Sequence, residues 1–201
     1  MTTYNYEGAR ILAPLTITSN EPVYEVETVS LKKQRASQNV QRWEISFNVI
    51  GEKSTEVDLF LKSAEGMEDV RTMIMPQLNA VSSAYTLSSS NVPVQAIASA
   101  GVTTVYLNTS SITGKLPKGS FFKFSNHSKL YVTTADMVSN NGTVALTFFP
   151  KLRAAITGSH TVNTGDSAIL TYYRSIDSQT GITFSDGILS SVGTIDLVEA
   201  L

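Results

Sequence analysis

Residues 107–152 read LNTSSITGKLPKGSFFKFSNHSKLYVTTADMVSNNGTVALTFFPKL, and this stretch decides the fold of the region around it. Short alternating segments follow one another here, and turn residues such as Gly114, Pro117 and Gly142 separate them. With its neighbours the stretch predicts strands at residues 102–107, 120–124, 129–134, 143–149 and 168–173. Five short strands joined by such turns indicate a small closed or partly open β-barrel, which includes the OB type.

A second clear strand pattern lies before this region, at residues 41–49. Trp43, Ile45, Phe47 and Val49 alternate there with polar residues, which is typical of a half-buried antiparallel strand. Residues 23–31 also alternate, and the link at residues 32–39 is too polar to lie in a core. We expect a long hairpin arm that contacts a neighbouring copy. Its candidate contact residues are Lys32, Lys33 and Arg35.

Between residues 54 and 78 the apolar period changes to steps of three and four residues, which predicts a helical segment. Thr55 and Asp58 resemble a capping box, and Pro76 ends the segment. Gly66 breaks or kinks it, so either one helix or two short ones would cover the sheet. We expect Trp43 to pack against this segment. The expected contacts are Leu61, Met67 or Val70.

Charge divides the chain into three parts. Residues 1–92 have a net charge of −3, residues 93–174 of +5, and residues 175–201 of −4. Residues 182–184 and 194–198 are again strand-like and would return to the first sheet. This predicts a first domain made of residues 1–92 and 175–201, with residues 93–174 inserted as a second domain. The fold class is mainly β: a β-barrel or sandwich with a helical segment, plus an inserted OB-like small β-barrel.

Composition excludes several classes of protein. The 201 residues include no cysteine, which excludes disulfides, thiolate metal sites and thiol nucleophiles. No apolar run approaches the roughly 20 residues of a membrane helix, and the first residues do not resemble a signal peptide. We therefore expect a soluble protein without membrane partners, synthesised in a cytoplasm.

Catalytic and cofactor signals are weak. The histidines are His127 and His160, and neither has a second metal ligand at a suitable spacing. There is no nucleophile elbow and no phosphate-binding glycine loop. Glu25 and Glu27 share a strand face, where solvation explains two carboxylates better than glycosidase chemistry does. We expect no enzyme activity, no cofactor and no metal.

Basic residues near aromatic ones are the feature that most suggests a ligand. Four lysines between residues 115 and 129 lie close in sequence to Phe121, Phe122, Phe124 and Tyr131. Lysines beside aromatic residues are typical of platforms that bind single-stranded nucleic acid. However, alternation puts Phe122 and Phe124 on the face opposite Lys123, which favours aromatic side chains in the core. The candidate contact residues for a ligand or partner are Lys115, Lys118, Lys123 and Lys129.

The order of motifs in residues 107–152 resembles the second domain of distal tail proteins, which form adaptors at the tip of long, non-contractile (siphovirus-type) bacteriophage tails. That domain has a Leu-Asn-Thr strand, a Thr-Gly turn, a Pro turn closed by Gly, a Phe-Lys-x-Ser-x-His-x-Lys-x-Tyr series and a strand closing in Pro-x-Leu. The matching residues here are 107–109, Thr113, Gly114, Pro117, Gly119, Phe122, Lys123, Ser125, His127, Lys129, Tyr131, Pro150 and Leu152.

Outside this stretch the resemblance is looser. It consists of the Trp43 strand, the pair Pro76 and Gln77, and a closing strand at residues 193–201. The resemblance implies a structural virion protein whose first domain forms a six-fold ring between the tail tube and the hub or fibre proteins. DNA would pass through the lumen, and the acidic flanks would repel it. The second domain would project outward to contact fibres or host-surface sugars.

Two alternatives stay open at this point. The motifs are turn and strand residues, so a related baseplate or tail-tip ring protein fits them as well. A carbohydrate- or nucleic-acid-binding module that acts through the OB-like insert is the alternative from a different functional class.

Overall fold

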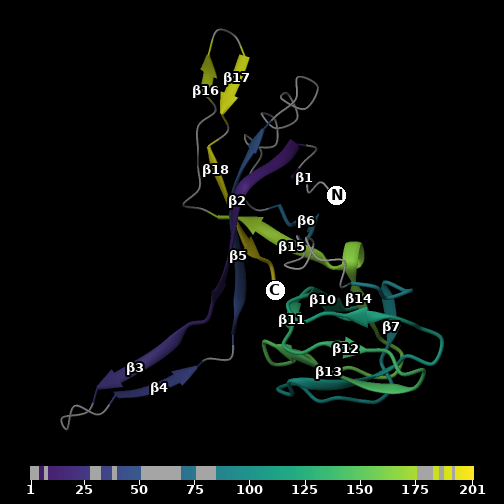
Figure 1. Cartoon of the computed structure of the whole chain (residues 1–201). Helices are drawn as coiled ribbons and strands as arrows, with labels where there is room; N and C mark the ends of the chain where they lie inside the picture. The colour runs from purple at the N-terminus through teal and green to yellow at the C-terminus, as the bar shows by residue number, and fades with distance from the viewer. Residues whose placement is uncertain are drawn as a thin grey trace.

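The computed structural model describes residues 5–6, 9–27, 33–37, 40–50, 69–75, 85–175, 183–185, 188–191 and 193–201. Strands dominate these residues, and their helical element is the single 3-10 turn Gly165–Ser167. Figure 1 shows an extended sheet with hairpins projecting from it, and a compact barrel beside it. The predicted mainly-β class is confirmed.

The first sheet contains six antiparallel strands from distant parts of the chain. Its order is β1 (Asn5–Tyr6), β2 (Ala9–Asn20), β5 (Arg42–Ile50), β18 (Thr194–Glu199), β15 (Ile169–Arg174) and β6 (Arg71–Ile74). The prediction that the chain returns to this sheet is confirmed for residues 194–198, because β18 lies between β5 and β15; it is wrong for residues 182–184, because Thr183–Ser185 belongs to a separate two-stranded sheet. A register shift between Leu12 and Thr16 of β2 leaves Pro14, which has no backbone N–H, outside the regular ladder.

The faces of the first sheet follow the predicted alternation of β5. Trp43, Ile45, Phe47 and Val49 are buried, whereas Glu44, Ser46 and Asn48 on the other face are partly or fully exposed. Ile195 and Leu197 of β18 and Leu170 and Tyr172 of β15 join the same core cluster. One face of the sheet is therefore apolar and covered. We call the opposite face the outer face.

The helical prediction is wrong where the structure describes it. Residues 71–74 form strand β6, which pairs antiparallel with β15. Met73 and Met75 are buried while Ile74 is exposed, so the side chains alternate with a period of two. The rest of the predicted segment, with Leu61, Met67 and Pro76, lies outside the described residues.

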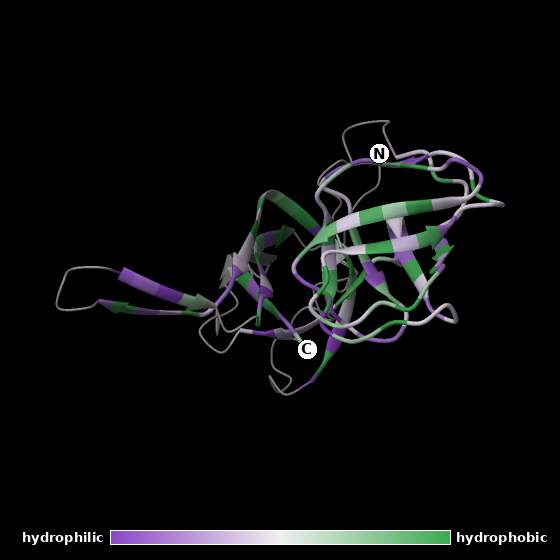
Figure 2. Ribbon diagram, turned by 90° about the horizontal axis from the view of Figure 1, so that it is seen from below, coloured by the Kyte–Doolittle hydropathy of each residue, from purple (hydrophilic) through white to green (hydrophobic). Residues whose placement is uncertain are grey.

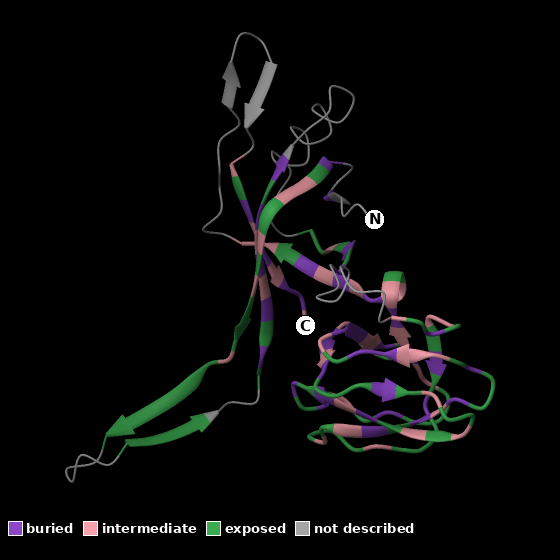
Figure 3. Ribbon diagram, in the orientation of Figure 1, coloured by how far each residue is buried: buried purple, intermediate pink, exposed green. Residues whose placement is uncertain are grey.

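A hairpin formed by β3 (Val23–Glu27) and β4 (Lys33–Ser37) follows β2 and extends away from both sheets (Figures 1 and 3). These strands pair only with each other in the described part of the chain. All five residues of β3 are exposed. A hairpin arm is present at this place, but its second strand lies within residues 32–39, which were expected to be a link, and residues 42–50 pair with β2 and β18. A second two-stranded pair, β16 (Thr183–Ser185) and β17 (Ile188–Ser191), precedes β18.

The second sheet forms the barrel. Its order is β7 (Asn91–Pro93), β14 (Thr161–Thr164), β10 (Phe121–Phe124), β11 (Leu130–Thr133), β13 (Thr143–Phe149) and β8 (Thr104–Asn108). A bridge between Val94 and Leu107, with the N–H of Gln95 donating to the carbonyl of Tyr106 at 2.8 Å, joins the chain after β7 to β8. The first and last strands of this sheet are therefore connected, and the barrel closes.

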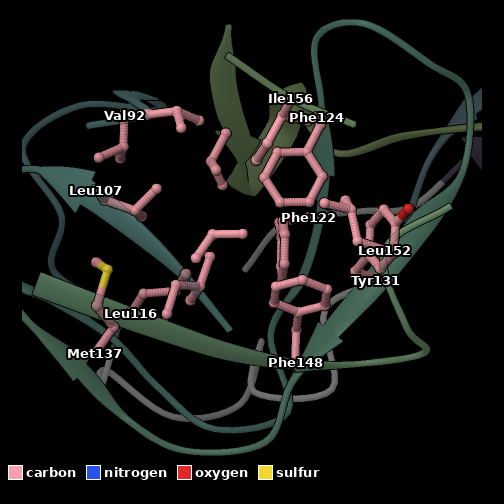
Figure 4. Packing of buried hydrophobic residues seen from close by; sticks show 14 of the residues in the cluster. Val92, Leu107, Leu116, Phe122, Phe124, Tyr131, Met137, Phe148, Leu152 and Ile156 are labelled. Carbon is pink, nitrogen blue, oxygen red and sulfur yellow. The ribbon is translucent and has the colours of Figure 1, made fainter. Parts of the chain in front are cut away.

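Aromatic side chains fill the barrel. Phe122, Phe124, Tyr131 and Phe148 meet at ring centroid distances of 5.2 to 5.8 Å (Figure 4). A small ladder of β9 (Lys115–Leu116) and β12 (Met137–Val138) adds Leu116 and Met137 to this core. The preceding segment also packs on the barrel, because a Cβ at Gly114, whose φ is +103°, would lie 2.0 Å from the carbonyl oxygen of Thr86.

One predicted barrel strand belongs elsewhere. Residues 168–173 were expected to be the fifth strand of the insert, but β15 pairs with β6 and β18 of the first sheet. Leu170 and Tyr172 accordingly lie in the first core. The chain enters and leaves the barrel at one place, where the N–H of Thr164 donates to the carbonyl of Ser90 at 2.7 Å.

Candidate functional site

The candidate functional sites are the lysine-bearing surface of the barrel, the β3–β4 hairpin and the contact between the two sheets. In the part of the chain that the structure describes, no group of three or more His, Asp or Glu side chains is placed to hold a metal ion. No helix among these residues is long and apolar enough to cross a membrane. His160 lies in a turn and its Nδ1 accepts the N–H of Thr157 at 2.9 Å.

The four candidate lysines lie in different surroundings. Lys115 forms an ion pair with Asp136 at 2.7 Å, and the backbone N–H of Lys118 donates to the same carboxylate at 2.7 Å. Lys123 is half-buried on β10. Lys129 is 3% exposed and forms an ion pair with Glu199 of β18. The structure therefore brings Lys115 and Lys118 together, while the Lys129 ammonium is directed to an internal partner.

The aromatic side chains near these lysines are all in the interior. Phe121, Phe122, Phe124 and Tyr131 are each at most 1% exposed. A base or a sugar ring can stack only on an aromatic face that solvent can reach. These four rings therefore cannot act as a stacking platform in this structure.

The contact between barrel and first sheet, which we call the junction, is built around the Glu199 carboxylate. This group accepts the N–H of Leu130 at 2.7 Å and the N–H of Trp43 at 3.1 Å, in addition to its bond with the Lys129 ammonium. The indole N–H of Trp43 donates to the Leu130 carbonyl at 3.0 Å. Three strands, β5, β11 and β18, are thereby linked through one buried carboxylate.

Burial affects the protonation of both charged groups at the junction. Desolvation lowers the pKa of Lys129 to about 8, and the opposite charge of Glu199 works against this shift. Desolvation likewise raises the pKa of the Glu199 carboxyl, while Lys129 and the two backbone N–H donors lower it. The ionised pair is stable only because each charge has its partner, so losing one partner would leave the other charge buried and unpaired.

Trp43 also belongs to the junction. Its ring meets Phe121 edge to face at 5.3 Å and lies 6.3 Å from Phe149, and the Lys129 ammonium lies 5.8 Å from its centroid. The predicted burial of Trp43 is confirmed. The residues that contact its indole ring in these pairs nevertheless come from the barrel, and the predicted contact Val70 is 51% exposed.

His127 has a structural role within the barrel. Tyr131 Oη accepts the N–H of Arg153 at 3.0 Å and lies 2.7 Å from His127 Nε2; because Nδ1 of the neutral imidazole faces an amide oxygen, Nε2 accepts the tyrosine O–H. His127 Nδ1 then donates to Asn126 Oδ1 at 2.6 Å. Desolvation, together with nearby cations, lowers the pKa of His127 to about 4, and it raises that of Tyr131 to about 12. The histidine is therefore neutral near pH 7 and fastens the β10–β11 turn to the segment after Pro150.

A cavity of about 160 Å³ lies beside the junction. Gln41, Lys129, Pro150, Lys151 and Arg153 are among the residues that line it. Gln41 is 4% exposed, and its Oε1 has no hydrogen-bond partner among the described residues. Three of the lining residues, Lys129, Lys151 and Arg153, are cations of the insert, so positive charge surrounds this cavity.

The predicted arm residues lie on one face of the hairpin, as far as the structure describes them. Lys33 and Arg35 form ion pairs with Glu25 at 2.9 and 2.7 Å. These two cations lower the pKa of the Glu25 carboxyl. Lys32 lies outside the described residues. The other hairpin face carries Tyr24 and Val26, which are 66% and 62% exposed.

Sequence reasoning missed both Glu199 and the apolar hairpin face. Glu199 ends a strand of alternating residues, where an acidic side chain usually faces solvent. A usable signal was present only for Tyr24 and Val26, because alternation places these two residues on the strand face opposite Glu25 and Glu27.

Comparison with known families gives one match that bears on function. Residues 86–165 match the model of the B domain of the distal tail protein pb9. The matched range contains the whole barrel, from β7 to β14, and confirms the resemblance to the distal tail proteins of siphoviruses. No curated protein matches the chain. A domain of this kind supports a structural role in a phage tail.

Proposed function

We propose that this chain, whose residues 86–165 match a distal tail protein B domain, is a ring-forming adaptor at the distal end of a phage tail. The match is the observation that carries this proposal. In the proposed assembly, copies of the chain form a six-fold ring that links the tail tube to hub and fibre proteins. The proposed location is the virion, and the protein has no catalytic role.

The outer face of the first sheet is suited to line the channel of such a ring. Its central part, residues 16–20, 44–48 and 194–198, presents threonine, serine and asparagine side chains, and its charged residues are Glu44 and Asp196. A hollow of about 270 Å³ lies on this face between β5 and β18. The charges within this part are negative, and Arg42 opposite Asn20 is a cation at its border, so phosphates would be held only weakly there while DNA passes.

We further propose that the barrel is an inserted domain with limits near residues 85 and 167, instead of 93 and 174. Tyr85 Oη lies 2.9 Å from Thr164 Oγ1, and Ser167 Oγ lies 3.2 Å from Ser90 Oγ. The two ends of this segment are therefore adjacent, as an insertion requires. The OB-like assignment of the barrel stays a prediction.

In the proposed particle the barrel projects from the ring towards fibres or other tail components. Lys115, Lys118 and Lys123 are its proposed contact residues. Binding of a carbohydrate or nucleic acid through the barrel is less well supported, because the four aromatic side chains that would stack on it are buried.

The mass of the assembly tests the adaptor function directly. Mass photometry at high protein concentration, with and without the tail tube protein, should detect closed rings. The isolated barrel, residues 85–167, is the matched control and should stay monomeric, because its sheet has no free edge. A strict monomer of the full chain under every condition, including with the tail partner, would contradict the proposal.

A further inference from the structure

The β3–β4 hairpin carries apolar side chains that nothing in the described chain covers. Tyr24 and Val26 are 66% and 62% exposed, and the hairpin projects into solvent away from both cores (Figure 3). An isolated two-stranded hairpin is marginally stable in water at best. Large exposed apolar groups on such an element are typical of an interaction surface.

The cross-strand register separates the hairpin into two different faces. Glu25 lies opposite Arg35 and forms its ion pairs with Arg35 and Lys33 on one face. Tyr24 lies opposite Ala36, and Val26 lies opposite Gln34, on the other face. Figure 2 shows that β4 is mostly hydrophilic, whereas β3 carries both hydrophilic and hydrophobic residues. The face formed by Tyr24, Val26, Gln34 and Ala36, which we call the apolar hairpin face, has no charged side chain.

A second apolar patch lies on the outer face at the far edge of the first sheet. Ile74 of β6 is 45% exposed and pairs with Ile169 of β15. In the same register Val70, just before β6, comes next to Tyr173, and these side chains are 51% and 41% exposed. We call these four residues the edge patch; the pair Thr72 and Thr171 lies between its two apolar pairs on the same face. It differs from the polar centre of the outer face, and β6 is the last strand of the described sheet.

We propose that the apolar hairpin face of one copy docks on the edge patch of the next copy. This inference rests on the ring proposed above and identifies its interface. Both surfaces are apolar, and both are exposed in the single chain. Because they are different surfaces at opposite ends of the sheet, the contact is head-to-tail, which is the type that repeats into a closed ring. The Glu25, Lys33 and Arg35 face stays in contact with solvent.

Single substitutions test each side of this contact. Tyr24→Ser and, on the edge patch, Tyr173→Ser should each weaken ring formation at least about tenfold, as expected for removing a large apolar contact from an interface. Tyr106→Ser is the matched control, because Tyr106 of β8 is 54% exposed but lies on the barrel. It should leave ring formation unchanged. Circular dichroism melts check that each variant is folded.

Site-directed crosslinking tests the pairing of the two surfaces. The chain has no cysteine, so introduced thiols are the only ones present. Subunits with Val26→Cys and subunits with Ile74→Cys should form a disulfide-linked dimer when mixed under ring-forming conditions. Each variant alone should stay uncrosslinked. Crosslinking of Val26→Cys subunits to one another would indicate a hairpin-to-hairpin contact and would overturn the proposal.

The two proposals fail in different ways. If the unmodified chain forms rings and both serine variants form them equally well, the interface is wrong while the ring stands. If the mixed cysteine subunits in such rings do not crosslink, the assignment of the edge patch is also wrong. If no ring forms under any condition, both proposals are wrong.

Discussion

The barrel and the first sheet bury similar side chains, but they differ in how their strands end. The barrel closes through the bridge between Val94 and Leu107 and keeps an aromatic core of its own. The first sheet has open edges at β1 and β6 in the described part, and its core includes Phe121 and Leu130 from the barrel. The barrel is thus complete in itself, whereas the first sheet depends on groups supplied from outside.

This difference explains where the buried charge lies. Closed barrels need no polar contact to terminate their strands, since every edge is already paired. At the junction, by contrast, the backbone N–H groups of Trp43 in the first sheet and Leu130 in the barrel need a common acceptor. Glu199 provides it, and Lys129 balances its charge.

The largest expected effect is on independent folding, which we expect for the barrel and not for the first sheet. Expressed alone, residues 85–167 should give a cooperative thermal melt. The remainder, with these residues replaced by a short Gly/Ser linker, should not, because Trp43 and the Glu199 carboxylate lose their partners. Differential scanning calorimetry of both fragments measures this. A cooperative melt of the remainder would show that the first sheet does not depend on the barrel.

Breaking the ion pair at the junction should have the next largest effect. Lys129→Met leaves the Glu199 carboxylate buried without its counter-charge, which should cost about 3–5 kcal/mol of unfolding free energy. Lys115→Met is the matched control, since it removes an exposed ion pair with Asp136. That change should leave the unfolding free energy nearly unchanged, because solvent screens an exposed pair. Urea titrations of both variants would show equal losses if the junction pair were no more important than the surface pair.

A change confined to the barrel should have a smaller effect. Gly114→Ala introduces a Cβ at 2.0 Å from the Thr86 carbonyl at a φ of +103°. Gly101→Ala is the control for strain alone, because Gly101 has a φ of +93° and open space around it. We expect Gly114→Ala to cost about 1–3 kcal/mol more than the control. Equal unfolding midpoints for the two variants would mean that the segment at Thr86 moves aside.

The effect that is smallest at neutral pH is a pH dependence that originates in the barrel. Since the pKa of His127 is about 4 in the folded chain and 6.5 is its ordinary value, the unfolded chain binds an extra proton between these pH values. Stability should therefore fall as the pH drops from about 6.5 to about 4. His127→Gln should reduce this slope when unfolding is measured at several pH values. Parallel pH profiles for the two proteins would contradict a half-buried histidine that stays neutral in the folded chain.

The sequence was most informative where local chemistry determines local structure. The alternation around Trp43 predicted which face of β5 is buried, and turn residues such as Gly114 predicted the barrel turns. Residues 70–74 were misread because apolar residues at three- and four-residue steps also occur in a strand with apolar groups on both faces. Here Met73 faces the core, while Val70 and Ile74 belong to the edge patch.

Pairings over long distances could not be predicted in the same way. Lys129 and Glu199 are 70 residues apart, and nothing near either residue marks its partner. The same holds for β15, whose sequence is suitable for a barrel strand but whose neighbours are β6 and β18. β2 was missed because Pro14 and the register shift interrupt its alternation.

The single crossing point at Ser90 and Thr164 has a consequence for how such chains evolve. Recombination near residues 90 and 164, which are adjacent in the fold although distant in the sequence, could replace the barrel by a different one. No strand of the first sheet would be interrupted. The new barrel would still need a cation at the position of Lys129 and a free backbone N–H at the position of Leu130, because both groups bind the Glu199 carboxylate. In related chains the residues at positions 129 and 199 should therefore vary together. A chain that acquires a new barrel would be restricted in which residue it can carry at the end of β18.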